Sequence, residues 1–399
     1  TDPSRPFMYE GTSGGNNTTE IFAKMYSSVE RCKDFIKEQH HMPFILCEYA
    51  HAMGNSTGNM KEYWDLIYAD NNFQGAFVWD WMDQGLQQEV PEEYKATSQK
   101  DIFYAYGGWW EEARGIHHDG NFCMNGLLAS DGTPLPGLNT VKYFHQNIKV
   151  LPLNWEKMQF EITNRFDFTN VEDVVEGFWE LIENGVVVEQ DMLSNLTIKP
   201  GDSKNIELKL KHSLKDGKEY FVNFRFKLKE QTIYAEKGFE LAWEQFKLPN
   251  TQYKQVADTL LTKPMQIRHE GRKLHVIGED FTMVFDKMKG ILERYYYRNN
   301  LIVKQGPQPD FWRAYTDNDR GANKKKMEGT SSLIDIWQEA GNAWVVESFD
   351  IQEQSEVINL TASGLLPLVD ARYLQQYEIS GDGAIKVTCT YLAGGKELL

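Results

Sequence analysis

The segment FILCEYAHAMGNSTGNMKEYWDLIYADNNFQGAFVWDW, residues 44–81, decides the fold of the amino-terminal third of this chain. It contains two continuous apolar runs, Phe44–Tyr49 and Gly75–Trp81. Runs of this length are typical of parallel strands that are covered on both faces. Between the runs, apolar residues recur with helical spacing at Met60, Tyr63, Trp64 and Ile67. The segment therefore predicts a strand, a helix and a second strand.

Two further features extend this pattern toward the amino terminus. Asn55 and Ser56 precede the predicted helix, and we expect them to cap it. A third short apolar run, Pro6–Gly11, predicts another strand. Alternating strands and helices build barrels or open α/β sheets, and in both architectures ligands bind at the carboxyl ends of the strands. We expect residues 1–145 to form one such α/β domain.

From about residue 147 the pattern changes to the two-residue period of half-buried strands. Asn184-Gly185 lies between two apolar runs and predicts a tight hairpin. Several short strands of this kind predict an antiparallel β-sandwich over residues 146–250. Further alternating runs begin near residue 273 and predict another β-rich domain over residues 251–399.

Composition excludes several classes of protein. The 399 residues include 42 basic and 58 acidic side chains, which gives a net charge of −16. Such a charge repels phosphate backbones, so we expect no nucleic-acid partner. Hydrophobic residues make up 41% of the chain, and no apolar stretch approaches the length of a membrane-spanning helix. We therefore expect an ordered chain without a membrane partner.

Glu48 is the first candidate for chemistry. A carboxylate at the end of a buried strand is costly unless it is hydrogen bonded. It either pairs with an arginine or with backbone amides, or it acts as a nucleophile or acid/base at a barrel mouth. Its neighbour Cys47 is a thiol, but no arrangement of cysteine, histidine and asparagine supports a thiol nucleophile. Position alone leaves the two interpretations of Glu48 open.

Two more segments carry candidate residues. In Phe77–Gln84, strand alternation predicts Trp79 and Trp81 on one side and Asp80 on the other. A tryptophan at a strand end can stack on a sugar ring, or it can simply fill a core. In the third segment, His117–Gly126, adjacent histidines do not share a face of a helix or strand, so their spacing does not favour a metal site.

These segments resemble a known enzyme family. Glu48–Ser56, Phe77–Gln84 and Phe122–Leu127 are similar to the active-site half of β-galactosidases of glycoside hydrolase family 2. Two more stretches, Asp2–Gly11 and Phe311–Asp319, match the large bacterial enzymes of that family in the same order. The resemblance implies strands five to eight of a (β/α)8 TIM barrel, then an immunoglobulin-like β-sandwich, then the amino-terminal part of a β-galactosidase small-chain-like β domain.

The resemblance also implies roles for individual residues. Glu48 matches the nucleophile of a retaining mechanism, and Tyr26 matches the tyrosine that assists it. His51 matches the histidine that binds galactosyl hydroxyl groups, and Trp79 matches the tryptophan beneath the sugar. Hydrolysis of terminal β-D-galactose residues from lactose-like β-galactosides is the implied activity.

Cofactors and assembly follow from the same resemblance. Asn125 and the Phe122 carbonyl match ligands of a sodium ion that contacts the galactose, so Asn125 is also a substrate-binding candidate. Magnesium is expected for the intact enzyme, although its ligands are mostly absent from this chain, and His118 stays unassigned. Trp109-Trp110 replaces the family's Asp-Phe pair, so we expect the leaving-group subsite to differ from that of the family. We expect the intact enzyme to be a homo-oligomer.

One expected residue is missing from the sequence. Retaining glycosidases need two carboxyl groups, and in this family the acid/base glutamate follows an asparagine on the fourth barrel strand. The dipeptide Asn-Glu occurs nowhere in the 399 residues, and the chain has no initiator methionine. We therefore expect a piece of a longer enzyme that is inactive by itself. Localisation stays open between the cytoplasm and the periplasm of a bacterium.

Two alternatives remain at this point. One is another glycosidase of the same family, a β-glucuronidase or β-mannosidase. His51, three residues after Glu48, suits the galactosidase branch better. The other is a non-catalytic galactoside-binding module built from Trp79, His51 and the sandwich. An Asn-Glu pair on a preceding strand of the native protein would indicate an enzyme, and its absence a binding module.

Overall fold

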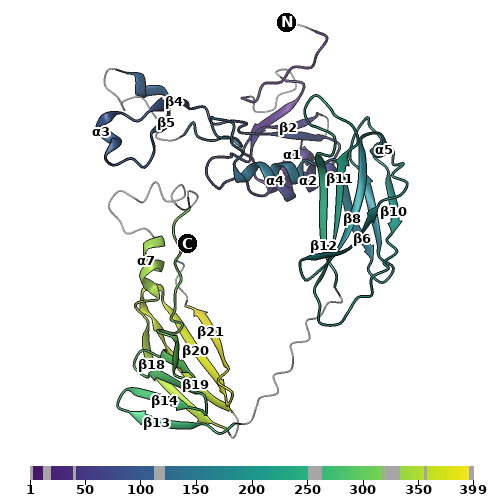
Figure 1. The fold of residues 1–399 in the computed structure, drawn as a ribbon. Helices are drawn as coiled ribbons and strands as arrows, with labels where there is room; N and C mark the ends of the chain where they lie inside the picture. The colour runs from purple at the N-terminus through teal and green to yellow at the C-terminus, as the bar shows by residue number, and fades with distance from the viewer. Residues whose placement is uncertain are drawn as a thin grey trace. The chain divides into compact units, whose positions relative to one another are not determined.

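The computed structural model describes residues 3–11, 19–38, 42–111, 122–249, 263–316, 319, 333–354 and 357–394. The chain forms two compact units, Thr1–Tyr253 and Lys254–Leu399 (Figure 1). No helix among the described residues is both long and apolar enough to cross a membrane. The finer division at residues 145 and 250 stays a prediction.

The first unit opens with a parallel sheet of three strands in the order β1-β2-β3 (Figure 1). Its elements are β1 (Phe22–Met25), α1 (Val29–Glu38), β2 (Phe44–Tyr49), α2 (Met60–Ala69), β3 (Phe73–Val78) and, further along the chain, α4 (Pro136–Phe144). The strand–helix–strand prediction for residues 44–81 is confirmed. No closed barrel forms among the described residues, so the sheet is the partial TIM barrel that the sequence predicts.

Side-chain alternation along β2 shows which face of this sheet is covered. Phe44 and Leu46 are 1% and 0% exposed and pack in one cluster with helical residues such as Phe35 and Met60. Burial on this scale stabilises the fold by about 1.5–3 kcal/mol for each side chain. Ile45 points to the other face and is only half-buried. The helices therefore cover one face, and the other is the inner face of the partial barrel.

The predicted strand at Pro6–Gly11 is wrong. Only Met8 forms a bridge there, a single parallel pairing with Ile21 just before β1. Phe7 is 54% exposed, so this run lacks the cover that a continuous strand of a parallel sheet requires. Of the four barrel strands that the resemblance implies for this chain, the first along the sequence is thus reduced to one bridge.

An arm of irregular structure follows β3. It contains β4 (Leu86–Glu89), α3 (Glu92–Lys95), β5 (Ile102–Ala105) and the 3₁₀ turn η1 (Gly107–Trp110). β4 and β5 pair as an antiparallel ribbon. The ring of Trp109 packs edge-on against Phe103, with 4.6 Å between ring centroids, while Trp110 is exposed.

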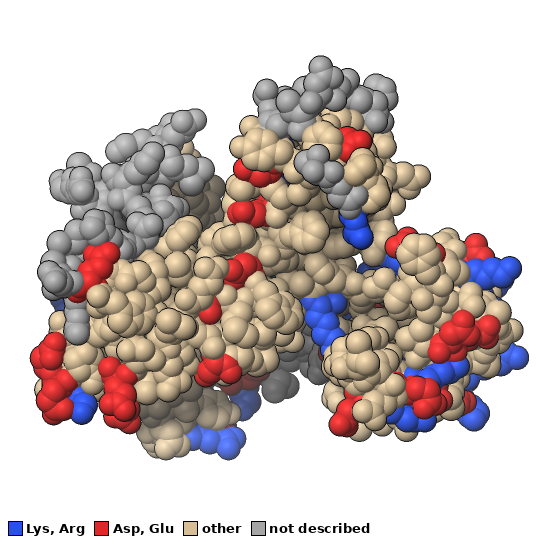
Figure 2. All heavy atoms as spheres, turned by 90° about the horizontal axis from the view of Figure 1, so that it is seen from above, with Lys and Arg blue, Asp and Glu red and all other residues tan. Residues whose placement is uncertain are grey.

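Figure 2 shows wide uncharged areas between scattered acidic and basic side chains on the face that it draws.

The rest of the first unit is a β-sandwich of two antiparallel sheets, in the orders β10-β7-β6 and β12-β11-β8-β9. Its elements are β6 (Ile148–Asn154), β7 (Gln159–Asn164), α5 (Val171–Val174), β8 (Val175–Glu183), β9 (Val186–Met192), β10 (Ser203–Glu207), β11 (Tyr220–Leu228) and β12 (Glu240–Lys247). Both sheets contribute to one core, where Phe160 meets Phe224 at 4.8 Å between ring centroids.

The predicted hairpin at Asn184-Gly185 is confirmed, because these two residues connect β8 to β9. Both have positive φ, 48° and 85°, as the tight turn between twisted strands requires. Glu244 on β12 then joins the sandwich to the barrel part. Its buried carboxylate accepts hydrogen bonds from Tyr143 at 2.8 Å and from Lys149.

The second unit is built from two antiparallel sheets, β13-β14-β15-β16-β17 and β18-β19-β20-β21. Side chains from β14–β16 and from β19 and β20 share one core. The elements are β13 (Gln266–Glu270), β14 (Lys273–Ile277), β15 (Phe281–Asp286), β16 (Ile291–Tyr297), β17 (Asn300–Val303), α7 (Leu333–Ala340), β18 (Val345–Glu353), β19 (Val357–Leu366), η3 (Pro367–Val369), β20 (Ala371–Ser380) and β21 (Ile385–Ala393). The β-rich character that the sequence predicts is confirmed.

Candidate active site

The carboxyl ends of β1 and β2 bring Tyr26 and Glu48 together. The Tyr26 hydroxyl donates a hydrogen bond to Glu48 Oε2 at 2.7 Å. The Tyr26 amide donates to the Glu48 carbonyl at 2.8 Å. Both strands then turn sharply, with φ of 48° at Tyr26 and 46° at Ala50. The two sequence-predicted catalytic residues therefore form one pair, at the edge of the sheet where α/β proteins bind ligands.

An irregularity in β2 orients the Glu48 side chain. The pairing of β1 with β2 shifts between Lys24 and Met25, and the pairing of β2 with β3 shifts between Leu46 and Tyr49. Such a bulge re-aims a side chain and is common next to active sites. Tyr49 is completely buried among the helices, whereas Glu48 is half-buried. The carboxylate is thereby held at the strand end and outside the helix-covered core.

Burial and the neighbouring Glu48 keep the Tyr26 phenol protonated. Partial burial, the hydrogen bond to Glu48 and the negative charge of Glu48 all raise the pKa of Tyr26 well above its usual value. Tyr26 is therefore a hydrogen-bond donor to Glu48 at neutral pH. Burial, followed by the charges of Glu10 and Glu48, also raises the pKa of Cys47. A raised thiol pKa is unfavourable for a cysteine nucleophile.

His51 lies on the loop that follows Glu48. Its ring centroid is 5.9 Å from that of Tyr26 and 6.0 Å from that of Phe122. Burial lowers the pKa of His51, although the charges of Asp80 and Glu48 act in the opposite direction. The imidazole is thus neutral at pH 7 and can both donate and accept hydrogen bonds.

The expected helix cap at Asn55 and Ser56 is wrong. α2 begins at Met60, and Asn59 occupies the N-cap without a side-chain hydrogen bond. Ser56 instead donates its hydroxyl to the His51 carbonyl at 2.6 Å. A serine can satisfy a nearby loop carbonyl as readily as a helix terminus, so local sequence does not distinguish the two uses. Here the hydroxyl holds the loop that carries His51.

Trp79 directly follows β3 and joins the same loop. Its amide donates to the Tyr49 carbonyl at 3.2 Å, and its carbonyl accepts from the Ala52 amide at 2.7 Å. β3 ends at Val78, so the predicted strand alternation does not continue through Asp80. Trp79 is half-buried and Trp81 is 62% exposed. The two tryptophans therefore lie in different environments.

Asn125 is the most buried of the predicted site residues, at 2% exposure. Its carbonyl accepts from the Asp80 amide at 2.9 Å. Its side-chain oxygen Oδ1 is buried and has no hydrogen-bond partner among the described residues. An amide oxygen without a partner suits a hard cation such as sodium, and the half-exposed Phe122 begins the same segment. The unpartnered Asn125 oxygen thus fits the sodium site that the resemblance implies, and the Phe122 carbonyl stays a prediction.

The described part of the chain gathers no group of three or more His, Cys, Asp or Glu side chains that could hold a metal ion. We therefore assign no magnesium ligand in that part. His117 and His118 lie outside the described residues.

Sequence reasoning missed an anchor behind Glu48. Its components are Tyr49, Trp64 of α2 and His145, which follows α4. The Trp64 indole donates to the Tyr49 hydroxyl at 3.0 Å, and that hydroxyl lies 3.0 Å from His145 Nε2. The rings of Trp64 and His145 pack at 4.6 Å. Burial lowers the pKa of His145, so the imidazole is neutral and its hydrogen bond with Tyr49 joins two uncharged groups.

This anchor makes stability depend on pH. Below about pH 6.5 the unfolded chain protonates at His145 while the folded chain resists protonation, so the unfolding free energy should decline as pH falls. One such group contributes at most about 1.4 kcal/mol per pH unit, down to its folded pKa. Urea unfolding between pH 7.5 and 5 should show a flatter pH dependence for His145→Gln than for wild type. His269→Gln, on an exposed position of β13, serves as the control, and equal slopes in all three proteins would contradict the assignment.

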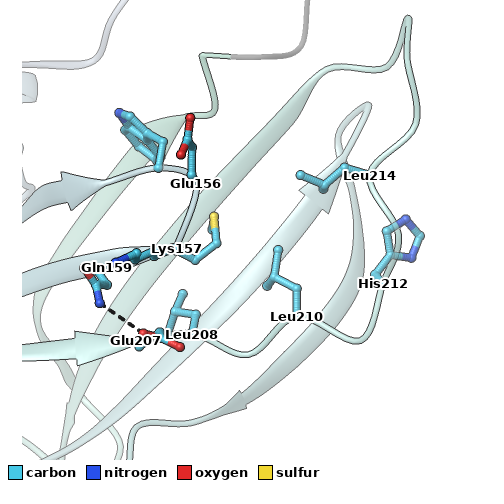
Figure 3. Close-up of a pocket in the computed structure, with 10 residues that line it drawn as sticks. Glu156, Lys157, Gln159, Glu207, Leu208, Leu210, His212 and Leu214 are labelled. Atoms are coloured by element: carbon cyan, nitrogen blue, oxygen red, sulfur yellow. Dashed lines mark hydrogen bonds between the residues drawn. The ribbon is translucent and has the colours of Figure 1, made fainter.

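The sandwich has a separate hollow of about 770 Å³ (Figure 3). Leu208, Leu210 and His212 line it, and Gln159 donates to Glu207 across one side at 3.0 Å. None of the site residues described above lines this hollow. The candidate active site is instead an open edge of the partial barrel.

Three family models match the chain in succession. They are "Glycosyl hydrolases family 2, TIM barrel domain" over residues 1–150, "Beta-galactosidase, domain 4" over residues 160–249, and "Beta galactosidase small chain" over residues 277–397. The chain belongs to glycosyl hydrolase family 2. The family resemblance read from the residues is thereby confirmed.

Family 2 proteins with curated names match along almost the whole chain. The β-galactosidase of Priestia megaterium is 31% identical over 97% of this chain and 36% of its own length. The β-galactosidase of Clostridium acetobutylicum is 30% identical over 98% of this chain and 41% of its own length. The chain thus spans about two fifths or less of these relatives. Among solved structures, a cycloalternan-forming enzyme from Listeria monocytogenes aligns with 60% of the chain, at 11% identity and a TM-score of 0.19 that is too low to bear on the fold.

Proposed function

We propose that this chain carries the nucleophile half of the active site of a retaining β-galactosidase. The observation that carries the proposal is the 2.7 Å hydrogen bond from Tyr26 to Glu48 at the carboxyl edge of the partial barrel. Family membership and the names of the relatives support galactosides as the substrate class. In this proposal Glu48 attacks the anomeric carbon and forms a galactosyl-enzyme intermediate.

Tyr26 assists Glu48 through its hydrogen bond. A protonated phenol can donate to the carboxylate in the free enzyme and orient it for attack. When the glycosidic bond forms to Glu48, the carboxylate loses charge and this hydrogen bond weakens. Tyr26 thus holds the nucleophile in place before reaction and releases it during the step.

Two residues would hold the sugar. His51, neutral and close to Tyr26, binds galactosyl hydroxyl groups as donor and acceptor. Trp79 offers its indole face to the apolar side of the galactose ring.

Sodium, when bound at Asn125 Oδ1 and the Phe122 carbonyl, would supply positive charge next to the sugar. Asn125 thereby contributes to substrate binding.

The general acid comes from sequence other than these 399 residues. A retaining mechanism needs a second carboxyl group about 5–5.5 Å from the first. The Asn-Glu pair that carries it in this family does not occur in the chain. We therefore propose that a preceding part of the full-length enzyme supplies the proton for the leaving group.

The role of Trp79 can be tested by galactose inhibition. In the full-length enzyme we expect Trp79→Ala to raise the inhibition constant of galactose at least about tenfold, because the stacking surface is lost. Trp179, 5% exposed in the sandwich core on β8, provides the control. Trp179→Phe keeps most of that core volume and should leave galactose inhibition unchanged. Comparable losses in both variants would show that Trp79 acts through packing alone.

A further inference from the structure

Asp80 has a carboxylate oxygen without a partner. Its Oδ1 is buried and has no hydrogen-bond partner among the described residues. The other oxygen, Oδ2, accepts a hydrogen bond from Gln84. A buried carboxylate oxygen is unfavourable unless a donor or a cation meets it. The fold therefore keeps Asp80 Oδ1 as a buried hydrogen-bond acceptor without a donor.

The backbone fixes Asp80 next to the candidate active site. Its amide donates to the Asn125 carbonyl at 2.9 Å, and its carbonyl accepts from the Leu127 amide at 3.0 Å. Gly126 completes this pairing, since a Cβ there would lie only 2.2 Å from the Asp83 amide nitrogen. Asp80 is therefore held by tight backbone contacts and does not depend on its side chain for its position.

The charge of Asp80 acts on the residues around Glu48. The backbone of the preceding residue, Trp79, pairs with Tyr49 and Ala52, which flank the segment that carries His51. Burial lowers the pKa of His51, and the negative charge of Asp80 acts in the opposite direction. No Lys or Arg side chain among the described residues forms an ion pair with Asp80 or Glu48 within 4.0 Å. The site consequently presents two carboxylates without a neutralising cation from those residues.

Such a site selects between classes of sugar. A neutral pyranoside offers several hydroxyl donors, and one of them can satisfy the free oxygen of Asp80. A uronic acid brings a carboxylate of its own, which two nearby carboxylates repel. The unpartnered oxygen thus matches a donor on the ligand, and the negative charge disfavours an anionic ligand.

We propose that Asp80 contacts the substrate, accepts a hydrogen bond from a sugar hydroxyl, and sets the preference for neutral pyranosides over uronic acids. This inference rests on the proposed function, because it concerns the same site. Asp80 would be a specificity-determining residue in addition to the proposed sugar-binding residues His51 and Trp79.

The test compares two substrates in the full-length enzyme. Asp80→Asn keeps the shape of the side chain and removes its charge. We expect kcat/KM for nitrophenyl β-galactoside to fall about tenfold to a hundredfold, mainly through KM, because a charged acceptor is lost. We also expect the ratio of kcat/KM for nitrophenyl β-glucuronide over the galactoside to rise at least about tenfold.

Asp70→Asn is the matched control. Asp70 precedes β3 at the opposite end of the strand, where its Oδ1 accepts from the Asn72 amide at 2.8 Å. This variant should keep both substrates at their wild-type ratio. A wild-type ratio in Asp80→Asn, with Glu48→Gln inactive, would overturn the inference and leave the proposed function intact. A wild-type enzyme that does not hydrolyse the galactoside would overturn the proposed function itself.

Discussion

Glu48→Gln in the full-length enzyme should reduce turnover of nitrophenyl β-galactoside by at least about 10⁴-fold. The amide has nearly the same shape but cannot act as a carboxylate nucleophile, so no galactosyl-enzyme intermediate can form. The Tyr26 hydroxyl can still donate to the amide oxygen, at the position where it meets Glu48 Oε2 at 2.7 Å. Stability should therefore change little, and circular dichroism together with thermal unfolding would confirm that the loss is chemical.

A mechanism-based label identifies the nucleophile independently of mutation. A 2-deoxy-2-fluoro galactoside should become attached to Glu48, and peptide mapping by mass spectrometry would locate it. Glu62→Gln, on the exposed side of α2, is the control and should retain activity. Attachment at Glu10 or Glu111, with Glu48→Gln still active, would reject Glu48 as the nucleophile.

The 399-residue chain assayed by itself should show no measurable hydrolysis of nitrophenyl β-galactoside, although it carries Glu48. It lacks the Asn-Glu pair, and general acid assistance is typically worth 10²–10⁴-fold. The loss should exceed this factor, because the described strands β1, β2 and β3 form an open sheet. Phe77 and Trp81, each 62% exposed, remain without cover.

Addition of the missing half should restore activity. An open sheet edge and exposed apolar side chains favour pairing with a complementary chain. A separately expressed amino-terminal part of the full-length enzyme, refolded together with this chain, should therefore restore hydrolysis. The same mixture made with Glu48→Gln should stay inactive. Turnover by the purified chain alone, unchanged by Glu48→Gln, would mean that another catalytic pair exists in it.

Local features of the sequence were sufficient to predict individual helices and strands. They were not sufficient to predict which of these elements other parts of the chain cover. The spacing within residues 44–81 predicted β2, α2 and β3, and Asn184-Gly185 predicted the β8–β9 hairpin, because period and turn chemistry act over a few residues. The same reasoning failed for Pro6–Gly11, where the apolar run has too little cover to form a strand. Strand formation there depends on neighbours that a local pattern does not describe.

Burial illustrates the same limit. The continuous apolar run Phe44–Tyr49 predicted a strand that is covered on both faces. Phe44 and Leu46 are buried beneath the helices, whereas Ile45 on the other face is only half-buried. A two-residue period states which side chains share a face, and only packing against other elements decides which face is covered.

For the candidate site too, some features follow from the sequence and others only from the structure. Family motifs in the sequence were enough to select Tyr26, Glu48, His51, Trp79 and Asn125. The structure alone decided that a bulge shifts the alternation along β2, so that Tyr49 and not Glu48 joins the buried core. It also showed that Tyr26 reaches Glu48 at 2.7 Å. It also revealed the unpartnered oxygen of Asp80, a residue that alternation had merely placed opposite two tryptophans. Hydrogen bonding and burial are properties of atoms that are distant in the chain and close in space, so no local pattern of residues contains them.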